Sequence, residues 1–251
     1  MNQATIDKMR NMRLLGMLES FNTWLQNTNL QSLTPDELVA HLVDSEWEDR
    51  HQRKLQRLIK NARFRYKASL QEIDYEAPRG LDRSLILRLS NGDFIRRAEN
   101  IIITGPTGVG KSFLASAIGH QACVLGMRTF YASTYKLFAN LKMAKADGSY
   151  QKLVRRIEKQ ELLILDDFGL KTMDNNARMA LMEIIEDRHQ RCSTIITTQL
   201  PVKHWHEAIG ESTVADAIMD RLVHSAHRIN LSGESMRKKK RNQNEEKQDN
   251  K

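Results

Sequence analysis

Gly105-Pro-Thr-Gly-Val-Gly-Lys-Ser112 matches the pattern G-x-x-x-x-G-K-[ST] at every position. An apolar run at 101–103 precedes this segment and a helical pattern at 113–118 follows it, which is the strand, loop and helix setting that the pattern requires. Its glycines let the backbone curl so that several N–H groups point inwards at phosphate oxygens, and the helix N-terminus favours anions. The segment therefore predicts a phosphate-binding loop (P-loop).

Two side chains of the loop have predicted roles in binding ATP with Mg²⁺. We expect Lys111 to place its charge on the β- and γ-phosphates and Ser112 to offer its hydroxyl to the metal ion. The predicted nucleotide-binding residues are Gly105, Pro106, Thr107, Gly108, Val109, Gly110, Lys111, Ser112 and Phe113.

A second part of the site is predicted at Glu161-Leu-Leu-Ile-Leu-Asp-Asp167. Four apolar residues followed by acids are typical of a buried strand that delivers carboxylates to its C-terminal edge, where parallel sheets bind ligands. We expect Asp166 to hold Mg²⁺ through water and Asp167 to orient or deprotonate the attacking water. The alternative is a strand that merely ends in two solvated acids.

The surrounding pattern predicts an α/β fold with a central parallel sheet flanked by helices, preceded by a small all-α module. From residue 93 onward strands alternate with helices, which is typical of such a sheet. The expected strands are 100–104, 128–132, 162–166, 194–198 and 228–231. The expected domains are a helical module at 1–70, a connector at 71–92, a P-loop ATPase domain at 93–235 and a basic disordered tail at 236–251.

Within the helical module, residues 4–30 have helical spacing of apolar side chains. A long helix is expected to start at Pro35, with Thr34 as N-cap and Glu37 completing a capping box.

The composition excludes several classes of protein. With 251 residues, 40% of them hydrophobic, the chain can bury a core without metals or disulfides and does not have the composition of a disordered chain. No apolar run approaches the roughly 18 residues that span a bilayer, and residues 1–20 have no signal-peptide core. Cys123 and Cys192 form no metal-binding spacing. We therefore expect a cytoplasmic protein with reduced thiols and no membrane partner.

The net charge of +8 suggests a polyanionic partner, and its location indicates where that partner binds. Residues 236–251 carry seven basic and three acidic side chains, whereas residues 50–67 carry eight basic and no acidic ones. Several of the eight share one helical face. Either this face is merely solvated or it contacts the phosphates of duplex DNA, which we favour. The candidate DNA-binding residues are Arg50, Arg53, Lys54, Arg57, Lys60, Arg63, Arg65, Lys67, Lys238, Lys239, Lys240 and Arg241.

Several blocks together resemble the AAA+ ATPases. They are the P-loop, Leu162-Leu-Ile-Leu-Asp-Asp-Phe-Gly169, Ile195-Ile-Thr-Thr-Gln-Leu-Pro201, Asp220-Arg-Leu222 and His227-Arg-Ile-Asn-Leu-Ser-Gly-Glu-Ser235. Within that class the chain resembles the IstB group, which are helper ATPases encoded beside the transposase of a bacterial insertion sequence. It is also similar to the DnaC-type helicase loaders.

The resemblance implies further roles. Thr198 and Gln199 occupy the sensor-1 position, and Arg221 matches the arginine finger that reaches the nucleotide of a neighbouring subunit. It also implies a homo-oligomer with nucleotide at subunit interfaces, and duplex DNA and a transposase as partners. Asp167 stands where many AAA+ proteins have Glu, which implies either slow hydrolysis or a use of ATP mostly as an assembly switch. Only 16 residues follow residue 235, too few for the usual helical lid.

Three functions remain open from the sequence. An ATP-dependent switch would assemble on duplex DNA, largely without regard to its sequence, and recruit or activate a transposase. A DnaC-like helicase loader would use the same chemistry on a different partner. A small-molecule kinase shares the P-loop but would need a lid and an acceptor pocket in place of the basic module and tail.

Overall fold

The computed structural model describes residues 2–27 and 33–236. The chain divides into two compact units, at 1–57 and 58–251. This division lies inside a single helix, α3 (Pro35–Ala62), so that residues 58–70 pack with the second unit. Among the described residues, no helix is both long and apolar enough to cross a membrane.

The first unit consists of α1 (Asn2–Asn11), α2 (Leu15–Gln26) and the beginning of α3. The helical spacing expected from residue 4 onward is divided between α1 and α2, because Arg13 adopts a left-handed conformation (φ 58°) between them. The expected capping box of α3 is confirmed. The Thr34 N–H donates to Glu37 Oε2 (2.8 Å), and the Glu37 N–H donates to Thr34 Oγ1 (3.3 Å).

The second unit is built on a five-stranded sheet in the order β2-β3-β4-β1-β5, with all strands parallel. The strands are β1 (Asn100–Thr104), β2 (Thr129–Ser133), β3 (Leu162–Phe168), β4 (Ser193–Thr198) and β5 (Ala226–Asn230). All five expected strands exist, and the boundaries differ by at most two residues. The predicted α/β fold is therefore confirmed.

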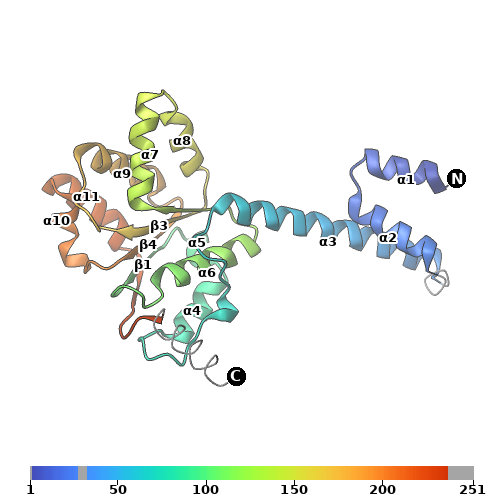
Figure 1. Cartoon of the computed structure of the whole chain (residues 1–251), viewed down its shortest axis with the longest axis horizontal. Coiled ribbons are helices and arrows are strands. Elements are labelled where there is room, and N and C mark those ends of the chain that lie inside the picture. Colours follow the sequence, from blue (N-terminus) through green and yellow to red (C-terminus); the bar gives the residue numbers. More distant parts are fainter. Residues whose placement is uncertain (1, 28–32, 237–251) are drawn as a thin grey trace, which may run out of the picture. The chain divides into compact units, whose positions relative to one another are not determined.

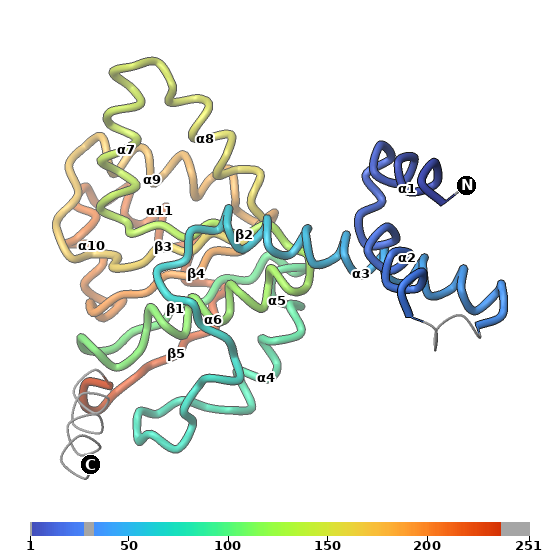
Figure 2. The backbone as a smooth tube through the Cα atoms, turned by 45° about the vertical axis from the view of Figure 1, so that its right-hand side comes forward, coloured from blue at the N-terminus to red at the C-terminus, as the bar shows by residue number. Residues whose placement is uncertain are grey.

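Helices cover both faces of this sheet (Figures 1 and 2). Ile101, Ile103 and Ile164 pack in one core with α4 (Arg83–Ser90), α5 (Asp93–Arg96), α6 (Lys111–Val124) and the short η2 (Leu70–Glu72). Ile102 and Leu163 point to the opposite face, as the strand period of two requires. The helices of that face are α7 (Thr134–Ala146), α8 (Tyr150–Glu158), α9 (Asn175–Arg188), α10 (Trp205–Ile209) and α11 (Ser212–Val223), with η3 (Val202–His204) before α10.

The sheet is irregular at the end of β3. Leu165 is level with Ile196 and Phe168 with Thr198, so the two residues Asp166 and Asp167 face the single residue Thr197. This is a β-bulge, and Asp167 takes up the extra length in a left-handed conformation (φ 59°). The bulge turns the Asp167 side chain out of the regular alternation of the strand, at the carboxyl edge where β1 also ends.

Candidate functional site

The P-loop, the end of β3 and the end of β4 meet around one cavity of about 490 Å³. Its predicted lining residues are Thr107, Gly108, Gly110, Lys111, Ser112, Phe113, Asp167 and Gln199. Lys111 begins α6, and its Nζ donates to the carbonyl oxygens of Gly105 and Pro106, at 2.8 Å each. The ammonium group is therefore held inside the curve of the loop, where the motif predicts it to meet phosphate.

The loop is anchored by apolar packing and by an arginine that no sequence motif singles out. Val109 is fully buried, and its carbonyl accepts a hydrogen bond from Arg79 Nη1 (3.2 Å). A Cβ on Gly110, whose φ is 101°, would lie 2.7 Å from that same Nη1, so the residue must be glycine. Burial lowers the pKa of Arg79. The hydrogen bond from Arg79 therefore holds the Val109 carbonyl of the P-loop in place.

The carboxylate of Asp166 is fully buried and accepts hydrogen bonds from several side chains. Ser112 Oγ donates to its Oδ1 at 2.7 Å, and the hydroxyl groups of Thr197 and Tyr131 also donate to it. Burial and the bond to Asp166 raise the pKa of Tyr131, so this phenol stays protonated and remains a donor. Tyr131 is a residue of the site that the sequence motifs did not reveal.

The residues that meet here fit a magnesium ion bound together with a nucleotide. A serine hydroxyl and a carboxylate are the hard oxygen ligands that Mg²⁺ prefers, and phosphates and water supply the rest. Ser112 and Asp166 already lie within hydrogen-bond distance. Among the described residues, no group of three His, Cys, Asp or Glu side chains could hold a metal. Ser112 and Asp166 therefore remain the predicted metal ligands.

The two polar residues predicted at the end of β4 lie in different environments. Gln199 lines the cavity, where its Oε1 accepts a hydrogen bond from Thr107 Oγ1 (2.8 Å). Thr198, by contrast, is fully buried and does not line the cavity, and its hydroxyl donates to the Phe168 carbonyl (2.7 Å). The neighbouring Thr197 contacts the two acidic residues instead. Its hydroxyl donates to the Asp166 carboxylate and accepts the backbone N–H of Asp167 at 3.1 Å.

The segment after α3 also lines the cavity, which corrects the expectation that Arg65 contacts DNA. Arg65 Nη1 lies 3.2 Å from Asp166 Oδ2 and 3.1 Å from Asp167 Oδ2. The next residue, Tyr66, packs its ring against Phe113, with the ring centres 6.2 Å apart. Arg65, Tyr66 and Arg79 belong to the nucleotide pocket, although residues up to 92 were expected to form a helical module and a connector.

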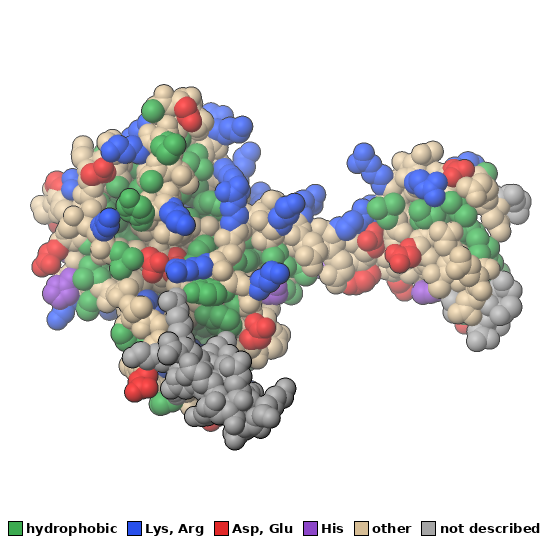
Figure 3. Space-filling view, in the orientation of Figure 1, with side chains coloured by type: hydrophobic (Ala, Val, Ile, Leu, Met, Phe, Trp, Pro, Cys, Tyr) green, Lys and Arg blue, Asp and Glu red, His purple; other side chains and the backbone are tan. Residues whose placement is uncertain are grey.

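The basic residues that share one face of α3 are only partly free of acidic neighbours. Arg50 pairs with Glu46 (2.6 Å) and Arg53 with Asp49 (2.5 Å), one helical turn earlier. The expectation that the eight basic residues at 50–67 have no acidic partners is therefore wrong, because Glu46 and Asp49 lie just before that segment. Figure 3 shows Lys and Arg side chains projecting from this helix. The exposed members that make no ion pair within the described residues are Lys54, Arg57, Lys60, Arg63 and Lys67.

The remaining predicted DNA-binding residues, Lys238, Lys239, Lys240 and Arg241, lie outside the residues that the structure describes.

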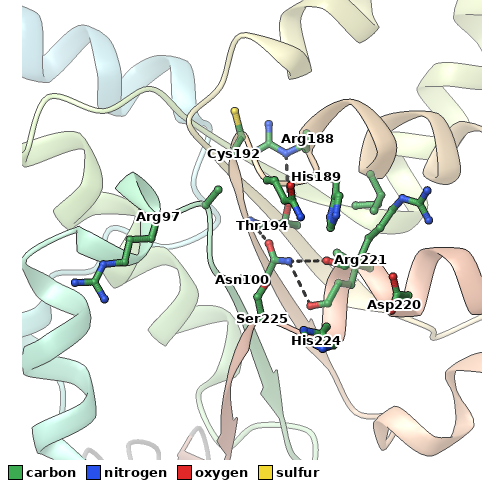
Figure 4. A pocket seen from close by; sticks show the side chains of 14 residues that line it. Arg97, Asn100, Arg188, His189, Cys192, Thr194, Asp220, Arg221, His224 and Ser225 are labelled. Atoms are coloured by element: carbon green, nitrogen blue, oxygen red, sulfur yellow. Dashed lines mark hydrogen bonds between the residues drawn. The ribbon is translucent and has the colours of Figure 1, made fainter.

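Arg221 lies in a separate pocket of about 340 Å³ at the amino ends of β1 and β4 (Figure 4). It extends from α11, and its Nη2 is 2.6 Å from Glu186 Oε2 on α9. Asn100 fixes the end of α11, since its side-chain amide donates to the carbonyls of Arg221 (3.1 Å) and Leu222 (3.3 Å). Arg221 is therefore remote from the nucleotide pocket of its own chain.

Sequence comparisons identify the relatives of the chain. A family model described as IstB-like ATP binding protein matches residues 7–244. A protein of Sinorhizobium fredii named as an insertion-sequence ATP-binding protein is 48% identical over 237 residues, covering 94% of this chain and 97% of that relative. A Pseudomonas aeruginosa protein named as the ATP-binding protein of insertion sequence IS21 is 31% identical over 217 residues, covering 86% and 82%.

A comparison with solved structures supports the fold alone. The crystal structure of the DnaC helicase loader superposes with a TM-score of 0.55 at 22% identity, and covers 66% of this chain and 97% of that one.

Proposed function

This chain belongs to the family of IstB-like ATP binding proteins, and we propose that it is an AAA+ ATPase that assembles on duplex DNA and recruits or activates the transposase of an insertion sequence. One observation carries the proposal: Lys111, Ser112, Asp166, Asp167 and Gln199 converge on a single pocket at the carboxyl edge of a parallel sheet.

The pocket supports hydrolysis of ATP. Lys111 neutralises the β- and γ-phosphates, and Ser112 and Asp166 hold Mg²⁺, which supplies further positive charge to the phosphates. Asp167 lies on the bulge beside the metal ligands, where its carboxylate orients water and accepts its proton. Gln199 and Thr107, linked by a hydrogen bond, place polar groups at the opposite rim.

Arg221 completes the site of a neighbouring subunit in this proposal. Its pocket lies at the amino edge of the sheet, whereas the nucleotide pocket lies at the carboxyl edge, so that Arg221 cannot serve its own nucleotide. An arginine that stabilises charge on a phosphate in trans makes turnover depend on assembly.

DNA binding is assigned to the exposed cations of α3. Phosphate contacts of this kind are largely independent of sequence and weaken steeply with salt. The transposase partner is inferred from relatives that are named as insertion-sequence proteins.

The test is ATP turnover of the full chain with and without duplex DNA. Stimulation by DNA that disappears in Lys111→Ala is the expected result. An ATP turnover rate that is the same with and without duplex DNA at low salt would contradict the coupling of ATP hydrolysis to DNA binding.

A DnaC-like helicase loader is the second candidate, because it would use the same nucleotide pocket with a different partner. The neighbouring reading frame discriminates the two. A transposase gene there supports the first function, and binding to a replicative helicase supports the second.

A further inference from the structure

Arg65 holds an unexpected position for a residue of the linker after α3. Its Nη1 is within 3.2 Å of Asp166 and 3.1 Å of Asp167, so that one nitrogen bridges the predicted metal ligand and the predicted base. The Arg65 side chain is 44% exposed, whereas that of Asp166 has no exposed surface. The guanidinium thus covers the carboxylates from the solvent side.

The residues that flank Arg65 are anchored, which aims its side chain at β3. The Phe64 ring packs edge-on against Tyr131, with ring centres 6.4 Å apart, and Tyr66 packs against Phe113. A Cβ on Gly119 would lie 2.6 Å from the Phe64 ring, so α6 approaches this ring closely. Arg65 also lies over the Tyr66 ring, 5.7 Å from its centre. Packing on α6 and β2 therefore fixes the linker on both sides of Arg65.

Two cations would lie beside the same carboxylates, namely the Arg65 guanidinium and a bound magnesium ion. Two adjacent carboxylates repel unless a cation neutralises them, and Arg65 supplies one positive charge. A magnesium ion held by Ser112 and Asp166 brings two more charges to the same carboxylate, which repels the guanidinium.

We propose that Arg65 and the magnesium–nucleotide complex compete for Asp166 and Asp167, so that nucleotide loading releases Arg65 from the carboxylates. This inference rests on the proposed magnesium and ATP site. Arg65 follows the last residue of α3, Ala62, by three residues.

The test compares the affinity of a non-hydrolysable ATP analogue with Mg²⁺ and with EDTA, by titration calorimetry. The measured quantity is the ratio of the dissociation constant in EDTA to that in Mg²⁺. Without Arg65 as a competitor, Mg²⁺ should increase the affinity for the analogue by a larger factor. Arg65→Ala is therefore expected to raise this ratio about threefold to tenfold. Arg65→Gln, which keeps length and hydrogen bonding but removes the charge, is the second variant and should do the same. Arg65→Lys keeps a cation and should lie between wild type and Arg65→Ala.

Arg88→Ala is the matched control, because it removes one exposed charge from α4, outside the pocket. A ratio in Arg65→Gln that equals the control, or that falls below it, overturns the competition. If the wild type binds the analogue equally with and without Mg²⁺, the magnesium assignment fails and the Arg65 proposal fails with it. A metal-dependent wild type with an unchanged ratio in the variants overturns the Arg65 proposal alone.

Discussion

At the scale of single residues, Thr197 shows how one side chain contacts both acidic residues of the site. Its hydroxyl bonds Asp166 and accepts the Asp167 N–H across the bulge, whereas Thr198, one residue later, bonds the Phe168 carbonyl in the core. Adjacent residues in a strand point to opposite faces, so the two threonines bond different groups.

Thr197→Val should therefore slow ATP hydrolysis more than it weakens ATP binding. A hydrogen bond to a charged group contributes about 1.5–3 kcal/mol, which corresponds to a loss of about tenfold to a hundredfold in kcat. Thr198→Val should instead lower the free energy of unfolding by about 1–3 kcal/mol through its unsatisfied buried partner. Steady-state kinetics and chemical denaturation check the pair, and equal kcat values in the two variants would contradict this division.

The two cysteines provide a separate test of burial. Cys123 is 1% exposed and burial raises the pKa of its thiol to about 11, whereas Cys192 is half-buried. Because a raised pKa reduces the thiolate fraction below pH 11, Cys123 should resist alkylation at pH 8. Iodoacetamide should label one thiol of the native protein, at Cys192, and the second only after denaturation. Rapid labelling of both thiols by the native protein would show that the core around α6 is open.

The residues of the site differ in whether a short sequence pattern predicts them. Lys111, Ser112, Asp166 and Asp167 were predicted because each belongs to a short contiguous pattern that carries its own chemistry. Arg65 and Tyr131 were not, since they contact Asp166 across 101 and 35 residues of sequence and no local pattern marks them. Packing alone brings them to the pocket.

At the scale of elements, the strands could be predicted because most of them are apolar runs and all of them alternate with helical segments. The bulge could not, because it depends on the register between β3 and β4. On α3, the helical period correctly predicts which cations share a face. Ion pairs with Glu46 and Asp49 still remove Arg50 and Arg53 from the freely exposed set.

Replacing Lys54, Arg57 and Lys60 together by alanine should weaken duplex binding and leave ATP binding unchanged. Each lost phosphate contact reduces the slope of log K against log salt by about 0.9, so the triple variant should lower it by about 2 to 3. Fluorescence anisotropy over a salt series measures the slope.

The matched control for that experiment removes three exposed cations elsewhere, at Arg88, Arg191 and Lys203. If both triple variants bind duplex DNA with the same affinity and salt slope, α3 is not the DNA surface.

At the scale of the whole molecule, the two units differ in how they are stabilised. Each face of the sheet in the second unit has its own core of buried side chains. Among residues 2–27 and 33–57 of the first unit, no apolar side chain is fully buried, and Val43 and Trp47 are 51% and 63% exposed. A unit this small is marginally stable alone. The sequence indicated helices here but not how little core they form.

Action of Arg221 in trans predicts complementation between two inactive variants. Lys111→Ala lacks a working nucleotide site but keeps its arginine, and Arg221→Ala keeps its nucleotide site. Mixed assemblies contain interfaces with both parts intact, so the mixture should hydrolyse ATP faster than either variant alone. Turnover of the mixture equal to the mean of the two would contradict action of Arg221 in trans.

Coupling of ATP to assembly on DNA is tested most directly by multi-angle light scattering of the full chain. Wild type should form particles of several subunits only when ATP, Mg²⁺ and duplex DNA are all present, and Lys111→Ala should remain at its unassembled mass under the same conditions. Particles of equal mass for wild type and Lys111→Ala, or for wild type with and without ATP, would contradict a nucleotide-controlled assembly.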